Sequence, residues 1–410
     1  MSKEPLATPL DLALVGGGLQ NGLVALATLA ARPDARIAIF ERGPALGGNH
    51  TWCFHDGDLP DDARPWLEPL VARRWAGYEV RFAPYRRALA SGYACITSAR
   101  FDEVVRATLA AAPHARVHTG VDVVAIAPGK VTVRAGGDGA PLHTVAATTV
   151  VDARGPGKAA VTGGWQKFVG QELELEAPHG LTDPVLMDAT VPQVDGFRFV
   201  YVLPLGPDRL LVEDTCFSED PALDAPRLRQ QLAAYVAAQG WRVRTQLREE
   251  DGVLPLPWQT EVVPPRPGLV TAGYQGGWFH PVTGYSFPVA LRVATTIAHA
   301  VARGDDPAAA VAATVPAHQA QLRFALRLVW MMFRWFPPAS RAGVLEHFYR
   351  LPEDTVRRFY ALALTGRDQA RMFLGRPPRG LSWRAMVRAG GGPDGISART
   401  IAARASEAAS

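Results

Sequence analysis

The sequence predicts an α/β protein: a Rossmann-type dinucleotide-binding domain with an inserted antiparallel sheet and a C-terminal helical region. A short apolar strand over 11–15 runs directly into a glycine-rich turn and then a helix, which is the order of a dinucleotide-binding fold. Two later apolar strands, over 149–152 and 268–273, also lead into glycine-containing turns. Between these two strands, from about 165 to 264, short apolar runs alternate with turn residues, as antiparallel strands do.

The composition of the 410-residue chain is that of a globular protein, because 48% of its residues are hydrophobic and 20% are charged. A net charge of +4 argues against a dedicated nucleic-acid partner. Cys53, Cys95 and Cys216 lie far apart without metal-ligand spacing, so we expect neither a metal site nor a disulfide framework. The N-terminus does not look like a secretory signal, and no run of about 18 apolar residues occurs. We therefore expect a cytoplasmic protein whose membrane contact is peripheral.

The first turn has the composition of a phosphate-binding loop. Gly16 and Gly18 let the backbone turn tightly and let a pyrophosphate approach the N-terminus of the following helix, where free N–H groups favour anions. Asn21 stands where the third glycine of the dinucleotide fingerprint is expected, and Gly22 follows it. A second apolar strand then ends in Glu41, whose carboxylate can accept both hydroxyls of an adenosine ribose.

The segments that follow favour FAD over a nicotinamide dinucleotide as the resident cofactor. A second glycine pair directly after the ribose acid is typical of FAD enzymes, whose long cofactor continues across this loop. A chain that returns three times to one sheet has the layout of the large FAD-binding, hydroxylase-like flavoprotein class. Arg154, in the second glycine turn, is a further candidate contact. The expected cofactor-binding residues are Gly16, Gly18, Glu41, Gly47, Gly48, Asp152, Gly155, Gly273, Thr283, Gly284 and Tyr285.

The inserted segment is expected to form the floor of a substrate pocket. The runs 197–203 and 209–213 predict two strands, and the Gly206-Pro207-Asp208 turn joins them into a hairpin. Further elements follow this hairpin: a helix over 225–239 and strands near 243–247 and 253–256.

From Pro307 onward the pattern is helical. The segment 321–336 mixes large apolar residues with arginines, which suits either a helix at a membrane surface or a core helix with solvated arginines. Asp368 and Arg371 fit an i,i+3 helix pair. The predicted division is 1–160 for the first part of the FAD-binding domain, 161–264 for the sheet domain, 265–305 for the returning FAD-binding segment, 306–390 for the helical region with its candidate membrane contact, and 391–410 for a flexible tail.

Several segments are more particular than glycine turns, above all GGNHTW, GWQKFVGQE and LLVEDT. Through these and other segments, from its first strand to about Arg379, the chain resembles the bacterial lycopene β-cyclases, an FAD-dependent family. The resemblance implies acid-initiated closure of β-ionone rings on the ψ ends of lycopene and other linear-ended carotenoids, without net redox change. It also implies reduced FAD, NADPH or NADH as the reductant, and a peripheral position on the inner membrane.

Ring closure requires an acid, a base and stabilisation of a cation. Glu213 and Asp214 are the candidate catalytic pair, and as neighbours in a strand they should point to opposite faces of the sheet. The resemblance assigns the acid to Glu213, the first acid of the EDT motif. Burial would keep such a carboxyl protonated, and a reduced anionic flavin would stabilise the cation. Whether Glu213 or the flavin takes the final proton stays open, and an ion-pair role for the two acids is the alternative.

Aromatic residues near the predicted cofactor loops are candidates for the substrate pocket. They are Trp52, Trp278, Phe279 and His280, although residues of these types more often pack, and a histidine beside a proline is more often structural.

Three rival functions remain. The first is a flavin monooxygenase acting on an apolar substrate, although Gly273 is followed by Tyr274 where that class commonly has aspartate. The second is a non-catalytic lipid escort, which does not need the glycines and acid of the first turn. The third is a cyclase that makes ε-rings or closes only one end.

Overall fold

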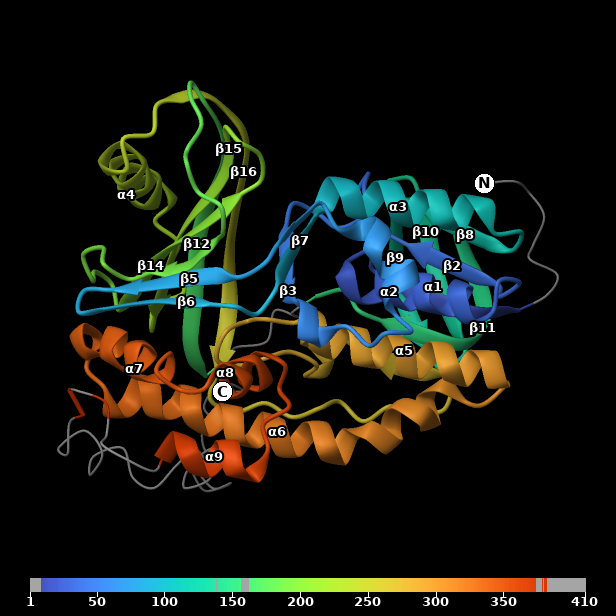
Figure 1. Ribbon diagram of the computed structural model, residues 1–410. Helices are drawn as coiled ribbons and strands as arrows, with labels where there is room; N and C mark the ends of the chain where they lie inside the picture. The colour runs from blue at the N-terminus through green and yellow to red at the C-terminus, as the bar shows by residue number, and fades with distance from the viewer. Residues whose placement is uncertain (1–8, 138, 156–161, 374–377, 379, 382–410) are drawn as a thin grey trace, which may run out of the picture.

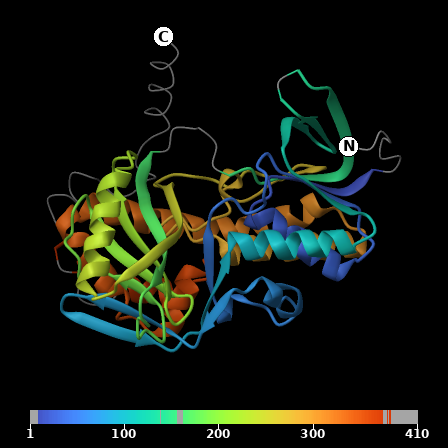
Figure 2. The same cartoon turned by 90° about the horizontal axis from the view of Figure 1, so that it is seen from above.

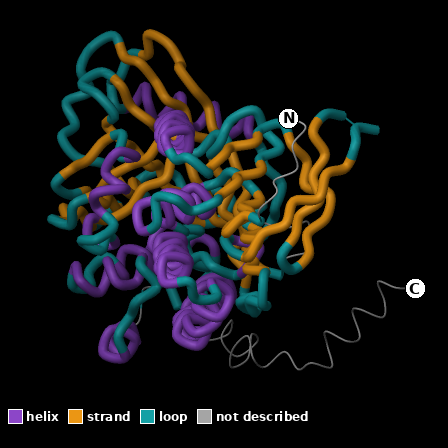
Figure 3. The backbone as a smooth tube through the Cα atoms, turned by 90° about the vertical axis from the view of Figure 1, so that its right-hand side faces the viewer, coloured by secondary structure: helices purple, strands orange, loops and turns teal. Residues whose placement is uncertain are grey.

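The computed structural model describes residues 9–137, 139–155, 162–373, 378 and 380–381, so the predicted tail over 391–410 lies outside it. Two β-rich regions stand side by side above a layer of C-terminal helices (Figure 1). Figure 3, a view from the side, shows the helices gathered mainly below the strands. This is the predicted α/β architecture with a helical C-terminal region.

The first sheet is the dinucleotide-binding sheet. Its parallel part joins β1 (Leu10–Val15), β2 (Ile37–Phe40), β8 (Ala115–His118) and β11 (Leu142–Asp152), and β17 (Leu269–Thr271) adds in parallel to β11. Because β1, β11 and β17 are parallel neighbours, the three glycine turns that follow them meet at the carboxyl ends of these strands.

Helices and a hairpin complete this domain. They are α1 (Leu19–Ala31), α3 (Ser98–Ala111), α5 (Phe287–Arg303), β9 (Val121–Ala127) and β10 (Lys130–Ala135). α1 begins four residues earlier than Leu23, where the helix pattern starts in the sequence. The β9–β10 hairpin stands out from the rest of the domain (Figure 2).

The second sheet carries the predicted hairpin. Its strand order is β16 (Val243–Pro257), β12 (Gly163–Leu175), β15 (Arg209–Ser218), β14 (Phe197–Pro204), β13 (Val185–Asp188), β5 (Tyr78–Phe82) and β6 (Tyr85–Leu89). β14 and β15 pair antiparallel as expected. The two strands predicted near 243–247 and 253–256 are instead one strand, β16, which follows β12 with two register shifts. β5 and β6 come from the 1–160 range, so this sheet extends beyond 161–264.

One face of this second sheet is covered by α4 (Ala225–Ala238), which buries Leu232 and Val236 against strand residues such as Leu173 and Val212. A small sheet of β3 (Thr51–His55), β7 (Tyr93–Thr97) and β4 (Arg73–Trp75) lies between the two large sheets (Figure 1). Two short helical turns, η1 (Asp56–Asp58) and η2 (Glu68–Leu70), flank α2 (Arg64–Leu67) beside it.

The C-terminal helices pack beneath both regions (Figure 1). They are α6 (Pro307–Trp335), α7 (Arg341–Phe348), α8 (Glu353–Tyr360) and α9 (Gly366–Phe373). The i,i+3 pair predicted between Asp368 and Arg371 is not formed. Asp368 instead accepts two hydrogen bonds from Arg358, at 2.7 and 2.8 Å, whereas Arg371 donates to Thr355. The buried position of Asp368 favours the longer-range partner on α8. Among the described helices, none has the length and apolar character needed to cross a membrane.

Candidate active site

The first glycine turn packs against the turn after β11 and is hydrogen-bonded to Glu41. Gly16 has φ +92°, and a Cβ there would lie 2.9 Å from the carbonyl oxygen of Ala153, so a side chain would collide with the turn after β11. Glu41 accepts the N–H of Gly17 at 2.7 Å and that of Gly43 at 2.6 Å. The predicted ribose acid is therefore held at the mouth of the turn.

The displaced third glycine has a structural explanation. Asn21 donates from Nδ2 to the carbonyl oxygens of Val15 and Gly16, both at 2.8 Å, and so fixes the turn. The close packing that the fingerprint needs falls instead to Gly22, because a Cβ there would lie 2.1 Å from the ring of Phe101 on α3. The two tasks are divided between neighbouring residues.

The N-terminus of α1 fits the pyrophosphate of a dinucleotide. Gly18 is the N-cap and offers no side chain to the free N–H groups, and the first turn contains no acidic residue. Among the described residues, no atom beyond the immediate chain neighbours lies within 4 Å of a Cβ built at Gly18 or at Gly155 in the β11 turn. Gly273 has φ +61°, and a Cβ built there would lie 4.0 Å from Cβ of Gln20 on α1. The three predicted turns thus form one cradle.

Asp152 and Arg154 bind each other within this cradle. Arg154 donates from Nε and Nη2 to the two carboxylate oxygens of Asp152, each at 2.9 Å. This carboxylate raises the pKa of Arg154 further. The pair fixes the β11 turn beside Gly155.

Glu213 lies on the face of the second sheet opposite α4. Four residues form a row across β16, β12, β15 and β14 in register: Glu250, Gly170, Glu213 and Tyr201. Thr215, two residues along β15, donates its hydroxyl to Glu213 Oε1 at 2.7 Å. This contact confirms that Glu213 and Thr215 share a face.

Asp214 points to the opposite face. It is fully buried and accepts hydrogen bonds from Nε and Nη2 of Arg198, at 2.8 and 2.6 Å. Burial raises the pKa of Asp214, and the Arg198 guanidinium opposes that rise. The two neighbouring acids therefore have different environments: Asp214 has an arginine partner, whereas Glu213 is hydrogen-bonded by a neutral hydroxyl.

The environment of Glu213 favours its neutral form. Burial raises the pKa of Glu213 to about 8, and the charge of Glu250 adds to the rise, while the hydrogen bond from Thr215 opposes it. Near neutral pH the group therefore carries a proton that it can donate. This is the electrostatic signature expected of a general acid.

The GGNHTW segment connects the cofactor cradle to this row. Thr51, three residues after Gly48, donates to Glu250 Oε2 at 3.3 Å and accepts from Arg248 at 2.7 Å. Arg248 also donates to Asn49 Oδ1 at 2.9 Å and to Glu250 Oε2 at 2.7 Å. The loop predicted to contact FAD is thus bonded to β16, the strand that carries Glu250 two positions across the sheet from Glu213.

The third cofactor loop also approaches this face of the sheet. A Cβ at Gly284 would lie 3.3 Å from Gln166 Oε1 on β12, a buried oxygen without a hydrogen-bond partner. Within the loop, the backbone N–H of Tyr285 donates to the Thr283 hydroxyl oxygen at 3.3 Å, and the Tyr285 hydroxyl donates to Asp58 at 2.9 Å. Glu213 therefore faces the space between the inserted sheet and the cofactor loops.

Three of the four predicted pocket residues are buried by packing. Trp278 stacks on His318 with ring centroids 4.6 Å apart, and Phe279 stacks on Tyr274 at 4.2 Å. His280 accepts from the N–H of Val282, and its Nε2 lies 2.9 Å from the carbonyl oxygen of Phe359. Burial lowers the pKa of His280 to about 3, which favours its neutral form.

Trp52, the fourth predicted pocket residue, is partly buried. Its ring lies 5.1 Å from that of Phe101. Sequence reasoning missed Glu250 and Tyr201, because only strand register places them in one row with Glu213. It also missed Thr51, which lies on β3 and reaches this row through its hydrogen bond to Glu250. The GGNHTW motif already contained Thr51, but nothing in the sequence paired it with Glu250.

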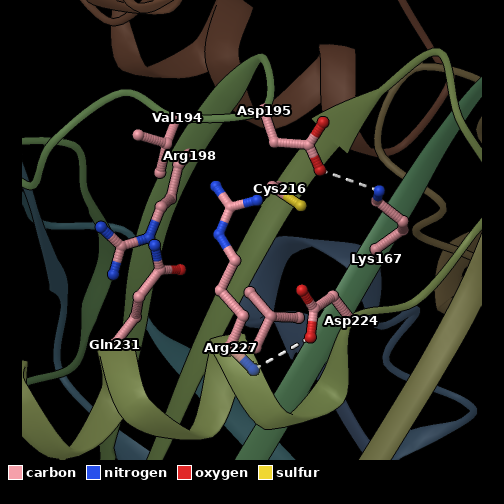
Figure 4. Close-up of a pocket in the computed structure, with 9 residues that line it drawn as sticks. Lys167, Val194, Asp195, Arg198, Cys216, Asp224, Arg227 and Gln231 are labelled. Atoms are coloured by element: carbon pink, nitrogen blue, oxygen red, sulfur yellow. Dashed lines mark hydrogen bonds and ion pairs between the residues drawn. The ribbon is translucent and has the colours of Figure 1, made fainter.

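A small cavity on the other face of the second sheet is a separate feature (Figure 4). It lies under α4, and two of its lining cations have carboxylate partners. Lys167 binds Asp195 at 2.9 Å, and Arg198 binds the buried Asp214. Because the sheet separates it from Glu213, this cavity does not belong to the candidate active site.

Comparison with solved structures defines the class of protein. The chain superposes on a geranylgeranyl bacteriochlorophyll reductase-like protein of Thermoplasma acidophilum with a TM-score of 0.55, at 16% identity, covering 93% of this chain and 95% of the other. The p-nitrophenol 4-monooxygenase PnpA of Pseudomonas putida gives 0.58 at 14% identity, covering 87% and 98%. The flavin-dependent brominase Bmp2 gives 0.60 at 13%, covering 89% and 98%. The fold is that of the FAD-dependent, hydroxylase-like flavoproteins.

The sequence places the chain more closely. Residues 11–386 match the family described as lycopene cyclase protein. The lycopene β-cyclase of Pantoea ananas is 42% identical over 388 residues, covering 90% of this chain and 95% of its own. The lycopene β-cyclase of Pseudescherichia vulneris is 40% identical, covering 92% of this chain and 97% of its own. That of a Paracoccus strain is 37% identical, covering 90% of this chain and 94% of its own. The protein belongs to the lycopene cyclase family.

Proposed function

We propose that the protein is a lycopene β-cyclase, which converts the ψ ends of lycopene into β-ionone rings through γ-carotene to β-carotene. The observation that carries this proposal is Glu213: a carboxyl group on a central strand, facing the cofactor loops and holding its proton near pH 7. The family relatives named as lycopene β-cyclases support the substrate and product. Because every atom of the substrate is kept, the reaction is an isomerisation.

Glu213 acts as the general acid. Its proton passes to the terminal double bond of the carotenoid, and the next double bond attacks the resulting cation to close the ring. A proton then leaves the carbon beside the new cation and forms the ring double bond. The return of one proton to the carboxylate of Glu213 would restore the enzyme. Asp214 supports the strand from the other face through Arg198.

FAD is the proposed cofactor, and the glycine cradle fits it. Gly16 keeps the first turn close to the β11 turn, and Gly18 and Gly155 would leave room for the pyrophosphate. Glu41 would accept the ribose hydroxyls, and the turns carrying Gly47, Gly48, Gly273, Thr283, Gly284 and Tyr285 would extend the cradle. When bound and reduced, with NADPH or NADH as electron donor, the flavin supplies negative charge that stabilises the carotenoid cation.

A peripheral contact with the inner membrane would give access to a substrate dissolved there. Most of the large apolar side chains of the 321–336 segment pack inward, including Trp330 and Phe333, so that face is core. The proposed contact is instead the opposite side of α6, where Phe324 meets Phe373, which is 51% exposed, and where Arg323 is also exposed. Phe373→Ser should reduce flotation with anionic vesicles, and unchanged flotation would remove this proposal.

Anaerobic incubation of the FAD-loaded protein with lycopene, with and without NADPH, tests the function. We expect β-carotene only when the flavin is reduced, with no NADPH consumed per ring. Glu213→Gln should abolish product while the flavin absorbance stays that of bound FAD. Linear lycopene with NADPH and oxygen consumption would instead establish a monooxygenase and remove the role of Glu213.

A further inference from the structure

The carboxyl groups of Glu213 and Glu250 share the space above a glycine. Gly170 on β12 pairs with Glu213 on one side and with Glu250 on the other. A Cβ at Gly170 would lie 3.3 Å from Cβ of Glu213 and 3.2 Å from Cγ of Glu250. Any side chain at this position would fill the gap between the two acids, so glycine leaves the space open between them.

The two acids have different partners. Glu250 is buried, and its Oε2 accepts from Arg248 at 2.7 Å and from Thr51 at 3.3 Å. Among the described residues, the side chain of Glu213 accepts one hydrogen bond, from the Thr215 hydroxyl. Burial raises the pKa of both carboxyl groups, but Arg248 and Thr51 oppose the rise at Glu250, whereas only the neutral Thr215 hydroxyl opposes it at Glu213. We therefore assign the charge to Glu250 and the proton to Glu213.

We propose that Glu250 is a positioning residue for the cyclisation: its charge, delivered across Gly170, keeps the proton on Glu213. The inference rests on the proposed role of Glu213 as the acid. Arg248 and Thr51 hold the Glu250 carboxylate. Thr51 belongs to the segment after Gly48, and Arg248 donates to Asn49 and Thr51 in that segment. The device therefore also links the acid to the cofactor loop.

The other charged groups near Glu213 are bound by arginines. From β15 itself, Asp214 lies on the far face and is neutralised by Arg198. From β12, Glu172 is bound by Arg209 and Arg248. On β14, the neighbour of Glu213 is Tyr201, which is uncharged at neutral pH. Its hydroxyl hydrogen-bonds with Cys53 on β3 and with Tyr93 on β7. Glu250 is therefore the charged group that lies directly across Gly170 from Glu213.

The test is the pH dependence of cyclisation in Glu250→Gln. Removing a like charge two strand spacings from Glu213, roughly 10 Å at the backbone, should move the alkaline limb of the kcat profile down by about one pH unit. Glu250→Asp keeps the negative charge, so the alkaline limb of its kcat profile should stay close to that of the wild type. Glu249→Gln is the matched control, because its side chain points to the α4 face and bonds to Arg229 and Gln171.

A second measurement does not depend on turnover. The infrared carbonyl band of protonated Glu213, assigned by its loss in Glu213→Gln, is titrated in the FAD-loaded protein without substrate. It should disappear at a lower pH in Glu250→Gln than in the wild type and Glu249→Gln. An unchanged titration in Glu250→Gln, or an equal shift in Glu249→Gln, would overturn the inference. If neither the wild type nor any variant cyclises lycopene, the infrared titration still tests whether Glu250 keeps the proton on Glu213, independently of the proposed function.

Discussion

The raised pKa of Glu213 should be visible as a pH-dependent loss of stability that Glu213→Gln removes. The substitution replaces a carboxyl group by a neutral amide of nearly the same shape and keeps an acceptor for the Thr215 hydroxyl. In the unfolded chain the carboxyl has its ordinary pKa of 4.5, whereas in the folded protein it is raised to about 8. Folding and proton binding are therefore linked at this site.

The sign follows from which state binds the proton. Between these two pKa values the folded protein holds a proton that the unfolded chain has released, so rising pH favours unfolding. The contribution is fully present below pH 4.5 and is lost as the pH rises through 8. At about 1.4 kcal/mol per pH unit the full interval corresponds to about 5 kcal/mol, an upper bound that shrinks to a few kcal/mol because Glu213 is partly solvent-accessible.

Urea unfolding of both proteins across about pH 5 to about pH 9, at fixed FAD, measures this difference. The stability of Glu213→Gln relative to wild type should rise with pH and level off above about pH 8. Glu249→Gln should show a constant difference over the same range, because Arg229 lowers the pKa of Glu249. If Glu213→Gln also showed a constant difference, Glu213 would be ionised at neutral pH and could not be the acid.

Three further substitutions probe the frame around the site. Asp214→Asn should destabilise the fold by about 3 kcal/mol, since it leaves Arg198 buried without its counter-charge; a thermal transition within error of wild type would contradict this. Gly22→Ala should cost about 1–3 kcal/mol, measured by urea unfolding, because its methyl group would overlap Phe101, and Phe101→Leu should recover part of the loss. Glu41→Gln should weaken FAD binding at least several-fold in a fluorescence titration; equal affinity would exclude its ribose role.

Short-range patterns predicted much of this molecule from its sequence. The order of strand, glycines, helix, strand and acid located the first turn and Glu41, because each step depends on residues close in the chain. The hairpin of β14 and β15 followed from alternation and a Gly-Pro-Asp turn. The opposite orientation of Glu213 and Asp214 followed from the two-residue period of a strand.

Features that depend on long-range register could not be predicted in this way. Glu250 lies 37 residues from Glu213 in the chain, and only their common pairing with Gly170 places them in one row. The partner of Asp368 was mispredicted for a similar reason: the helical spacing favoured Arg371, whereas packing of α8 against α9 supplies Arg358. Sequence periodicity determines the face on which a side chain lies but not its neighbour from another element.

Adjacent acids on one strand can serve opposite purposes because the sheet separates their environments. On the α4 face, Asp214 is matched by Arg198, and ionisation there is stabilised by a bidentate hydrogen-bonded pair. On the cofactor face, Glu213 has a second carboxylate as its charged neighbour and a hydroxyl as its donor, so ionisation there is opposed. An arginine placed beside Glu213 would bind the carboxylate and leave no proton to donate. The same reasoning explains why Arg248 is directed at Glu250: it keeps the negative charge on the acid that does not react.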